Sequence, residues 1–140
     1  MKLLGRTFIV LFFSTFLMIG CDVNDDGFFQ SSQVSRVLSA NVPDTMVIGE
    51  TYSLGLTYQK DSNCHTFSNF DVVSQGDSLV FVRAITLFTQ VPGCRQDALG
   101  ELKELEFNNI LESNFTFKFL NDVDNEGESV YIEREVVVIE

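Results

Sequence analysis

TYSLGLTY, residues 51–58, alternates polar and apolar side chains without interruption. Side chains of a β-strand point to its two faces in turn, so the two tyrosines and two leucines of this stretch share one face. The stretch therefore predicts a half-buried strand, preceded by a turn at Gly49-Glu50.

Further strand patterns flank this segment on both sides. Before it, we expect an edge strand that contains Val34, Val37 and Leu38, and a short strand near residues 45–48. After it, Gly76-Asp77 predicts a hairpin turn, and the apolar run of residues 78–88 predicts a central strand buried on both faces.

The C-terminal part continues the pattern. Phenylalanines at positions 115, 117 and 119 alternate with polar residues, and residues 130–139 predict one long final strand with Arg134 facing out. Between these regions, Leu99, Leu102 and Leu105 stand three apart, which leaves open one helical turn or a strand that opens at Leu105.

Strand patterns at this spacing predict an all-β fold. Six to eight strands fit the chain, and no ten-residue helical pattern separates them, so an antiparallel β-sandwich is favoured over βαβ units. The pattern resembles immunoglobulin-like sandwiches, although the chain has no Trp and lacks the Cys…Trp…Cys pattern of true immunoglobulin domains.

The first twenty residues have the layout of a signal peptide. Lys2 and Arg6 are followed by the uncharged apolar run Thr7–Ile19. As a helix, thirteen residues span only about 20 Å, less than the ~30 Å hydrocarbon core of a bilayer. We therefore expect a cleaved export signal in place of a permanent transmembrane helix.

The end of this run, Leu17-Met18-Ile19-Gly20-Cys21, resembles the lipobox of bacterial lipoproteins, with Met18 in place of the usual Leu. The resemblance implies cleavage before Cys21 and lipidation of that cysteine with acyl chains such as palmitate, which together anchor a protein stably. It divides the chain into a signal peptide (1–20), a lipidated acidic tether (21–33) and a β-sandwich domain (34–140).

Acidic residues follow Cys21 directly, in the order Asp22, Asp25 and Asp26. Acidic tethers resemble the export tag of surface lipoproteins in some Gram-negative groups, whereas Asp directly after the lipidated cysteine resembles an inner-membrane retention signal in others. We expect lipid anchoring in the outer membrane, on its periplasmic or its surface-exposed face.

Charge and composition exclude some classes of function. The 140 residues carry 9 Lys+Arg against 20 Asp+Glu, a formal net charge of −11. Nucleic-acid binding needs clustered basic residues to neutralise phosphates, so it is not expected. An acidic body also repels anionic membrane surfaces, so the membrane partner is reached through the lipid.

Three cysteines are present, and lipidation of Cys21 leaves Cys64 and Cys94 as a pair. In an oxidising compartment a disulfide is the expected outcome, joining two loop-like segments at one end of the sandwich. His65 is the only histidine, so a catalytic triad or a zinc cluster is hard to build, and we expect a loop histidine beside the disulfide.

The stretch from Asp122 has the spacing of a calcium loop. Asp122, Asp124 and Glu126 precede Gly127, and Glu133 stands at the twelfth position, where a calcium loop has its bidentate Glu. Residues 130–132 also predict a strand, which would carry Glu133 away from the turn. A weak calcium site and a solvated acidic hairpin are both compatible with this pattern.

Taken together, these observations predict a non-enzymatic envelope lipoprotein without a required cofactor. Its β-sandwich would bind a protein or glycan partner or have a structural role, and Tyr58, Phe67, Phe70 and Phe88 are candidate contacts. A small calcium-dependent adhesion module and a carboxylate-dependent hydrolase are the alternatives, because 20 acidic residues also permit a catalytic pair.

Overall fold

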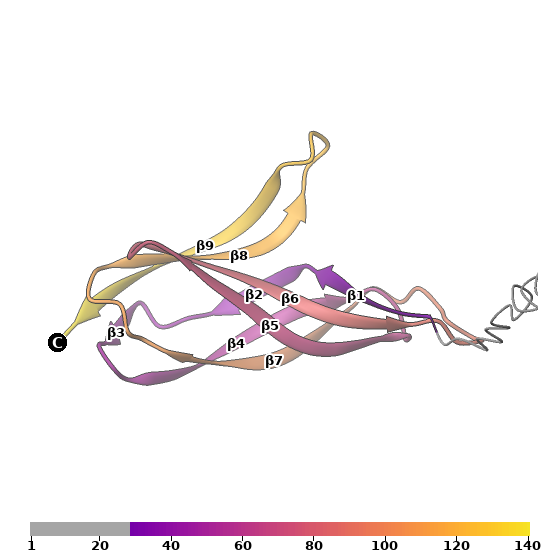
Figure 1. Ribbon diagram of the computed structural model, residues 1–140, viewed down its shortest axis with the longest axis horizontal. Coiled ribbons are helices and arrows are strands. Elements are labelled where there is room, and N and C mark those ends of the chain that lie inside the picture. Colours follow the sequence, from indigo (N-terminus) through magenta and orange to yellow (C-terminus); the bar gives the residue numbers. More distant parts are fainter. Residues whose placement is uncertain (1–28) are drawn as a thin grey trace, which may run out of the picture.

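The computed structural model describes residues 29–140, which fold entirely as strands and their connections (Figure 1). No helix in this part of the chain is long and apolar enough to cross a bilayer. The predicted signal peptide and Cys21 lie outside the described residues. The strands are β1 (Gln30–Ser35), β2 (Val37–Asn41), β3 (Thr45–Val47), β4 (Thr51–Lys60), β5 (His65–Gln75), β6 (Leu79–Thr89), β7 (Leu99–Asn108), β8 (Phe115–Val123) and β9 (Ser129–Ile139).

These strands form two sheets. The larger sheet has the order β1-β6-β8-β9-β3, with β5 on the other edge of β6, and the smaller sheet has the order β2-β4-β7. The all-β prediction is thus confirmed, but two details of it are wrong. Nine strands exceed the expected six to eight, and the larger sheet is mixed, because β6 pairs with β8 and β3 with β9 in parallel.

The core lies between the two sheets. Leu54, Leu56 and Tyr58 of β4 are fully buried, as the alternation predicts. From the other sheet Phe117 and Phe119 of β8 are also fully buried, with ring centroids 5.5 Å apart. Burying one such side chain contributes about 1.5–3 kcal/mol, so these two alternating segments supply much of the packing.

β6 is central, as predicted, but only the face with Val80, Val82 and Ala84 is buried, so the expectation of burial on both faces is wrong. Two strands, β8 and β1, pair with successive parts of one edge of β6. Residues 79–82 pair with β8, whereas residues 84–89 pair with β1. Because β1 occupies this edge beyond Val82, β8 separates from β6 after Phe119 and stays paired only with β9, with an irregularity in that pairing after Leu120. The distal parts of β8 and β9 therefore rise away from the body (Figure 1), and we call residues 120–132 the projecting hairpin.

Beyond Ser35 the chain changes sheets within a single residue. Arg36 separates β1 of the larger sheet from β2 of the smaller sheet. Asn121 Nδ2 donates to the Val37 carbonyl oxygen over 2.8 Å, and Arg36 forms an ion pair with Asp122 at 3.0 Å. These contacts link the two sheets along the side where β2 lies near β8.

The opposite side of the sandwich ends in two edge strands, β5 and β7. Lys103 of β7 stands opposite buried Leu56 and so points to the inner face, where its Nζ lies 5.8 Å from the centroid of the Phe67 ring. An inward-pointing charge on an edge strand disfavours pairing with a further strand.

Two predictions about boundaries need correction. Residues 99–108 form strand β7 along the whole of β4, so the helical turn is wrong, and the strand begins before Leu105. β1 begins at Gln30, within the predicted tether of residues 21–33, because Gln30–Gln33 pair with β6.

Candidate binding cleft at the disulfide end

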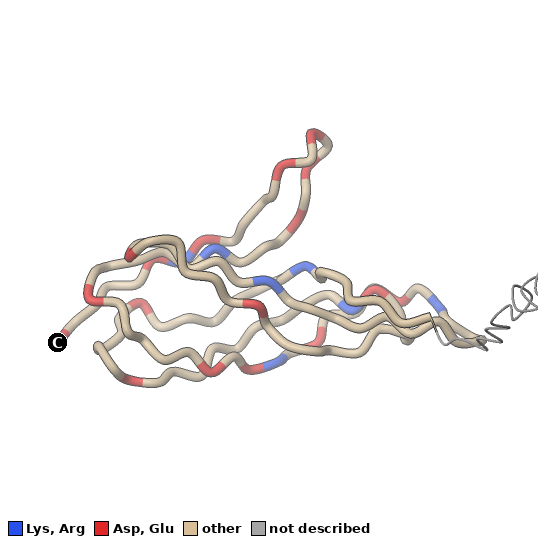
Figure 2. The backbone as a smooth tube through the Cα atoms, in the orientation of Figure 1, with Lys and Arg blue, Asp and Glu red and all other residues tan. Residues whose placement is uncertain are grey.

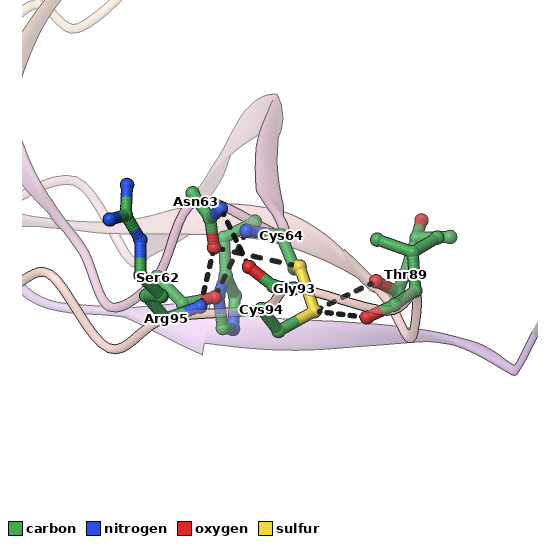
Figure 3. Close-up of a disulfide and its surroundings, with 9 residues drawn as sticks. Ser62, Asn63, Cys64, Thr89, Gly93, Cys94 and Arg95 are labelled. Atoms are coloured by element: carbon green, nitrogen blue, oxygen red, sulfur yellow. Dashed lines mark hydrogen bonds between the residues drawn. A yellow bond between two sulfur atoms is a disulfide. The ribbon is translucent and has the colours of Figure 1, made fainter.

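The Cys64–Cys94 disulfide forms as predicted and joins two connections at one end of the sandwich. Cys64 ends the turn between β4 and β5, and Cys94 lies in the loop between β6 and β7, with Cα atoms 5.5 Å apart (Figure 3). β5 starts and β6 finishes at this end, so the bridge fastens the long β6–β7 loop to the sheet.

Asn63 reinforces the bridge from the neighbouring position. Its Oδ1 accepts a hydrogen bond from the Arg95 backbone N–H at 2.7 Å, and its Nδ2 donates to the Gly93 carbonyl oxygen at 3.2 Å. The Asn63 backbone N–H also donates to the Arg95 carbonyl oxygen at 3.2 Å (Figure 3). The loop segment on both sides of Cys94 is therefore held by hydrogen bonds as well as by the disulfide.

His65 is a buried part of this scaffold and the first residue of β5. The Ser62 hydroxyl lies 2.6 Å from His65 Nδ1, and the Gln33 side-chain oxygen lies 2.8 Å from Nε2. Ser62 Oγ also accepts the Cys64 backbone N–H at 3.1 Å. If the imidazole donates from Nε2 to Gln33 and accepts at Nδ1 from Ser62, each donor in this hydrogen-bond network has an acceptor. The expected loop histidine is thus a hydrogen-bonded residue that links β1 to the β4–β5 turn.

Two adjoining cavities open beside this network. The smaller one, of about 250 Å³, is lined by Ser62, Cys94 and Arg95, among others, and the larger one, of about 640 Å³, by Gln33, Gln59 and Ala98, among others. Asp61, His65, Phe88 and Gln96 line both. We call the combined feature the disulfide-end cleft. Its volume lies in the range of ligand sites in proteins, about 300–1,000 Å³.

The described chain also begins at this end. The Gln90 backbone N–H donates to the Phe29 carbonyl oxygen at 2.9 Å, and Gln30 pairs with Thr89, the last residue of β6 (Figure 1). The segment that joins the domain to Cys21 therefore meets the sandwich at the disulfide end.

Tyr58 carries the most perturbed ionisable group in the described residues. Burial, together with its hydrogen bond to Glu101 Oε2 at 3.1 Å, raises the pKa of the phenol to about 12. Lys103, 2.8 Å from Glu101, lowers the pKa of that carboxyl, and the Tyr58 hydroxyl adds to the effect. The three side chains form a polar link across β4 and β7, and none of them lines the disulfide-end cleft.

Three of the four calcium candidates lie on the projecting hairpin and Glu133 lies just beyond it in β9, and the four do not converge. Asp122 pairs with Arg36, and Glu133 lies in β9 with its carboxylate 2.8 Å from Lys118 Nζ. Asp124 Oδ1 accepts the backbone N–H groups of Glu126 and Glu128, which closes the hairpin turn. Among residues 29–140, no cluster of three or more potential metal ligands is found.

The four aromatic candidates have different environments. Tyr58 is fully buried, and Phe67 and Phe70 are partly buried against the core. Phe88 lines the disulfide-end cleft, with its ring 5.0 Å from that of His65. Gln33, Gln59 and Gln96 also line the cleft and could not be singled out from sequence, because they come from three separate segments without a shared motif.

Comparison with protein-family profiles, with curated proteins and with solved structures finds no match to this chain.

Proposed function

We propose that the protein is a lipid-anchored envelope protein whose β-sandwich acts as a non-enzymatic binding module. One observation carries the proposal: Cys64 and Cys94 pair with each other, so Cys21 is the one cysteine of the three outside the disulfide. A disulfide fits an extracytoplasmic compartment, and the lipobox-like sequence before Cys21 provides the route to that compartment.

The geometry of the chain start adds a prediction about orientation. Eight residues after Cys21 the described chain begins at Phe29, and eight extended residues reach at most about 30 Å. The disulfide-end cleft would then lie close to the bilayer, and the turn at Gly76 would lie at the distal end. The acidic segment after Cys21 favours anchoring in the outer membrane, and the proposal allows the domain to lie on its periplasmic or on its surface-exposed face.

Two observations support a binding role over a catalytic one. The Ser62 hydroxyl and the His65 ring are both buried, and Ser62 also accepts the Cys64 backbone N–H, so the pair serves the fold of the turn. The positions of the acidic residues are spread along the body and the projecting hairpin (Figure 2). An immunoglobulin-like relationship is also part of the proposal, supported by the two packed sheets, although the parallel β6–β8 pair departs from purely antiparallel sandwiches.

Metabolic labelling with an alkyne analogue of palmitate in a Gram-negative host tests the anchor. We expect the wild-type chain to incorporate the label and to fractionate with membranes, and Cys21→Ala to lose both properties. The matched control, Cys64→Ala/Cys94→Ala, removes the other two cysteines and should keep the label. Label retained in Cys21→Ala, or absent from the wild type, would contradict the proposal.

Protease access on intact and lysed cells then determines the face. Digestion of the domain on intact cells indicates surface display, whereas protection until lysis indicates the periplasm. Protease should remove the projecting hairpin first, because residues 120–132 stand away from the body (Figure 1).

A further inference from the structure

Three glutamine side chains meet in the larger cavity of the disulfide-end cleft. Gln33 belongs to β1 and Gln59 to β4, while Gln96 lies in the loop that the disulfide fastens. Each carboxamide offers two N–H donors and one oxygen acceptor in a plane. Such groups match ligands that present neighbouring hydroxyl groups, because each hydroxyl both donates and accepts.

Existing hydrogen bonds orient these side chains and leave some of their donors and acceptors without a partner. Gln59 Nε2 donates to Asp61 Oδ1 at 2.7 Å, which leaves the Gln59 carbonyl oxygen and the second Asp61 oxygen as acceptors. Gln33 uses its oxygen for His65 and one amide N–H for Ser31 Oγ at 3.4 Å, so its second N–H remains as a donor. Within the described residues, the Gln96 side chain makes no hydrogen bond to another residue, and both of its polar atoms remain for a ligand.

The cleft also contains an apolar surface. Phe88 lines both cavities, and its ring lies against His65, which is fixed by Ser62 and Gln33. A partly exposed aromatic ring next to planar polar groups suits the C–H face of a sugar ring, while the carboxamides meet the hydroxyl groups at its rim.

Charge decides between neutral and anionic ligands. Asp61 places a carboxylate in the cleft, and the whole chain has a formal net charge of −11. Arg95 lines only the smaller cavity. A carboxylate in the ligand would meet Asp61 without a basic partner in the larger cavity, which disfavours acidic sugars.

We propose that the disulfide-end cleft binds a neutral oligosaccharide, through hydrogen bonds to Gln33, Gln59, Asp61 and Gln96 and contact of a sugar ring with Phe88. This inference rests on the binding role proposed above and names its ligand class. The disulfide has a specific part in it, because it holds the loop that contributes Gln96.

The test is a titration of the soluble domain, residues 22–140, followed by NMR of the glutamine side-chain amides. Maltotetraose, cellotetraose and chitotetraose serve as neutral probes. We expect at least one to shift the Gln59 and Gln96 side-chain signals in a saturable way, with a Kd of about 1 mM or tighter. The signal of Gln75, at the opposite end of β5, should stay unchanged.

Matched variants complete the design. Gln96→Ala should weaken binding about fivefold or more, as expected for the loss of one or two hydrogen bonds, while Gln75→Ala binds as the wild type does. Thermal unfolding of the unliganded variants verifies that both are folded. Absence of any saturable shift with all three probes, or equal effects of the two variants, would overturn the inference. A chain that carries lipid at Cys21 but binds none of the probes would retain the anchor proposal and lose this one.

Discussion

At the disulfide end, two connections are joined covalently and by the hydrogen bonds of Asn63, whereas the projecting hairpin is held mainly by its own β8–β9 pairing. Both regions are polar, and the sequence singles out the first for its cysteine pair and the second for its calcium-loop spacing. At the disulfide end, side chains from β1, β4, β6 and the fastened loop surround one cleft. At the base of the hairpin, Asp122 and Arg36 help to line a separate cavity of about 380 Å³, which no disulfide of the described residues fastens. Among the acidic candidates of the calcium pattern, Asp122 and Glu133 form ion pairs and Asp124 closes the hairpin turn, so their carboxylates are used separately. A polar surface becomes a candidate site where several elements are fixed against each other.

Removal of the disulfide should cause the largest loss of stability, because it releases the end of the sandwich that the bridge holds. The bridge closes a loop with a sequence separation of 30 residues, and Cys64→Ala/Cys94→Ala should lower the free energy of unfolding by about 3–4 kcal/mol in the chain-entropy model. Guanidinium unfolding of the soluble domain measures the change. A loss below about 1 kcal/mol would mean that hydrogen bonds alone hold the disulfide end.

Alkaline pH should destabilise the body through Tyr58. The pKa of this phenol is raised in the folded state, so its contribution is complete below the unfolded value of about 10 and is lost as pH rises through about 12. A shift of this size corresponds to about 2–3 kcal/mol lost between these pH values. Urea unfolding across this range should show the decline in wild type and a much smaller one in Tyr58→Phe.

The control for this measurement lies on the hairpin. Tyr131→Phe leaves the Tyr58–Glu101 contact intact, so its stability should fall with pH as that of the wild type does. Equal pH dependence in Tyr58→Phe and Tyr131→Phe would show that Tyr58 is not the group responsible.

Asn63→Ala should have a smaller effect, because its side-chain hydrogen bonds to the Cys94 loop are exposed. We expect a loss of about 1 kcal/mol in the free energy of unfolding and faster amide exchange at Arg95. Asn125→Ala, at the hairpin tip, is the matched control and should change stability by less than about 0.5 kcal/mol. Similar losses in the two variants would contradict the idea that Asn63 fastens the loop.

Asp124→Ala should have the smallest global effect. Its carboxylate accepts the backbone N–H groups of Glu126 and Glu128, so the variant should speed amide exchange at those two residues. Global stability should fall by only about 0.5 kcal/mol, because the turn projects from the body. Millimolar calcium should leave the wild-type melting temperature unchanged, and a rise that Asp124→Ala abolishes would restore the calcium alternative.

Local alternation predicted the core strands well. Leu54 and Leu56 are fully buried in β4, and Phe117 is fully buried in β8, as period-two patterns require. The helical alternative for residues 99–105 was wrong because Leu99 and Leu102 are exposed, at 62% and 64%, and the segment is a strand through its pairing with β4. Leucine spacing alone carries no information about such long-range pairing.

Topology and the cleft were beyond sequence reasoning for the same physical reason. The parallel pairing of β6 with β8 joins segments more than thirty positions apart, and no local pattern marks it. The disulfide could be predicted by counting cysteines, but the convergence of Gln33, Gln59 and Gln96 follows only from the way the sheets pack. Individually, these glutamines are ordinary polar surface residues.

The division of the three cysteines is the central claim, and peptide mass spectrometry without reduction tests it most directly. Protein extracted from membranes with detergent should give an N-terminal peptide that starts at Cys21 and carries acyl chains. The peptides that contain Cys64 and Cys94 should stay linked until a reductant is added. An unlipidated Cys21 in a membrane extract, or Cys21 linked to Cys64 or Cys94, would contradict both the anchor and the proposed orientation of the cleft.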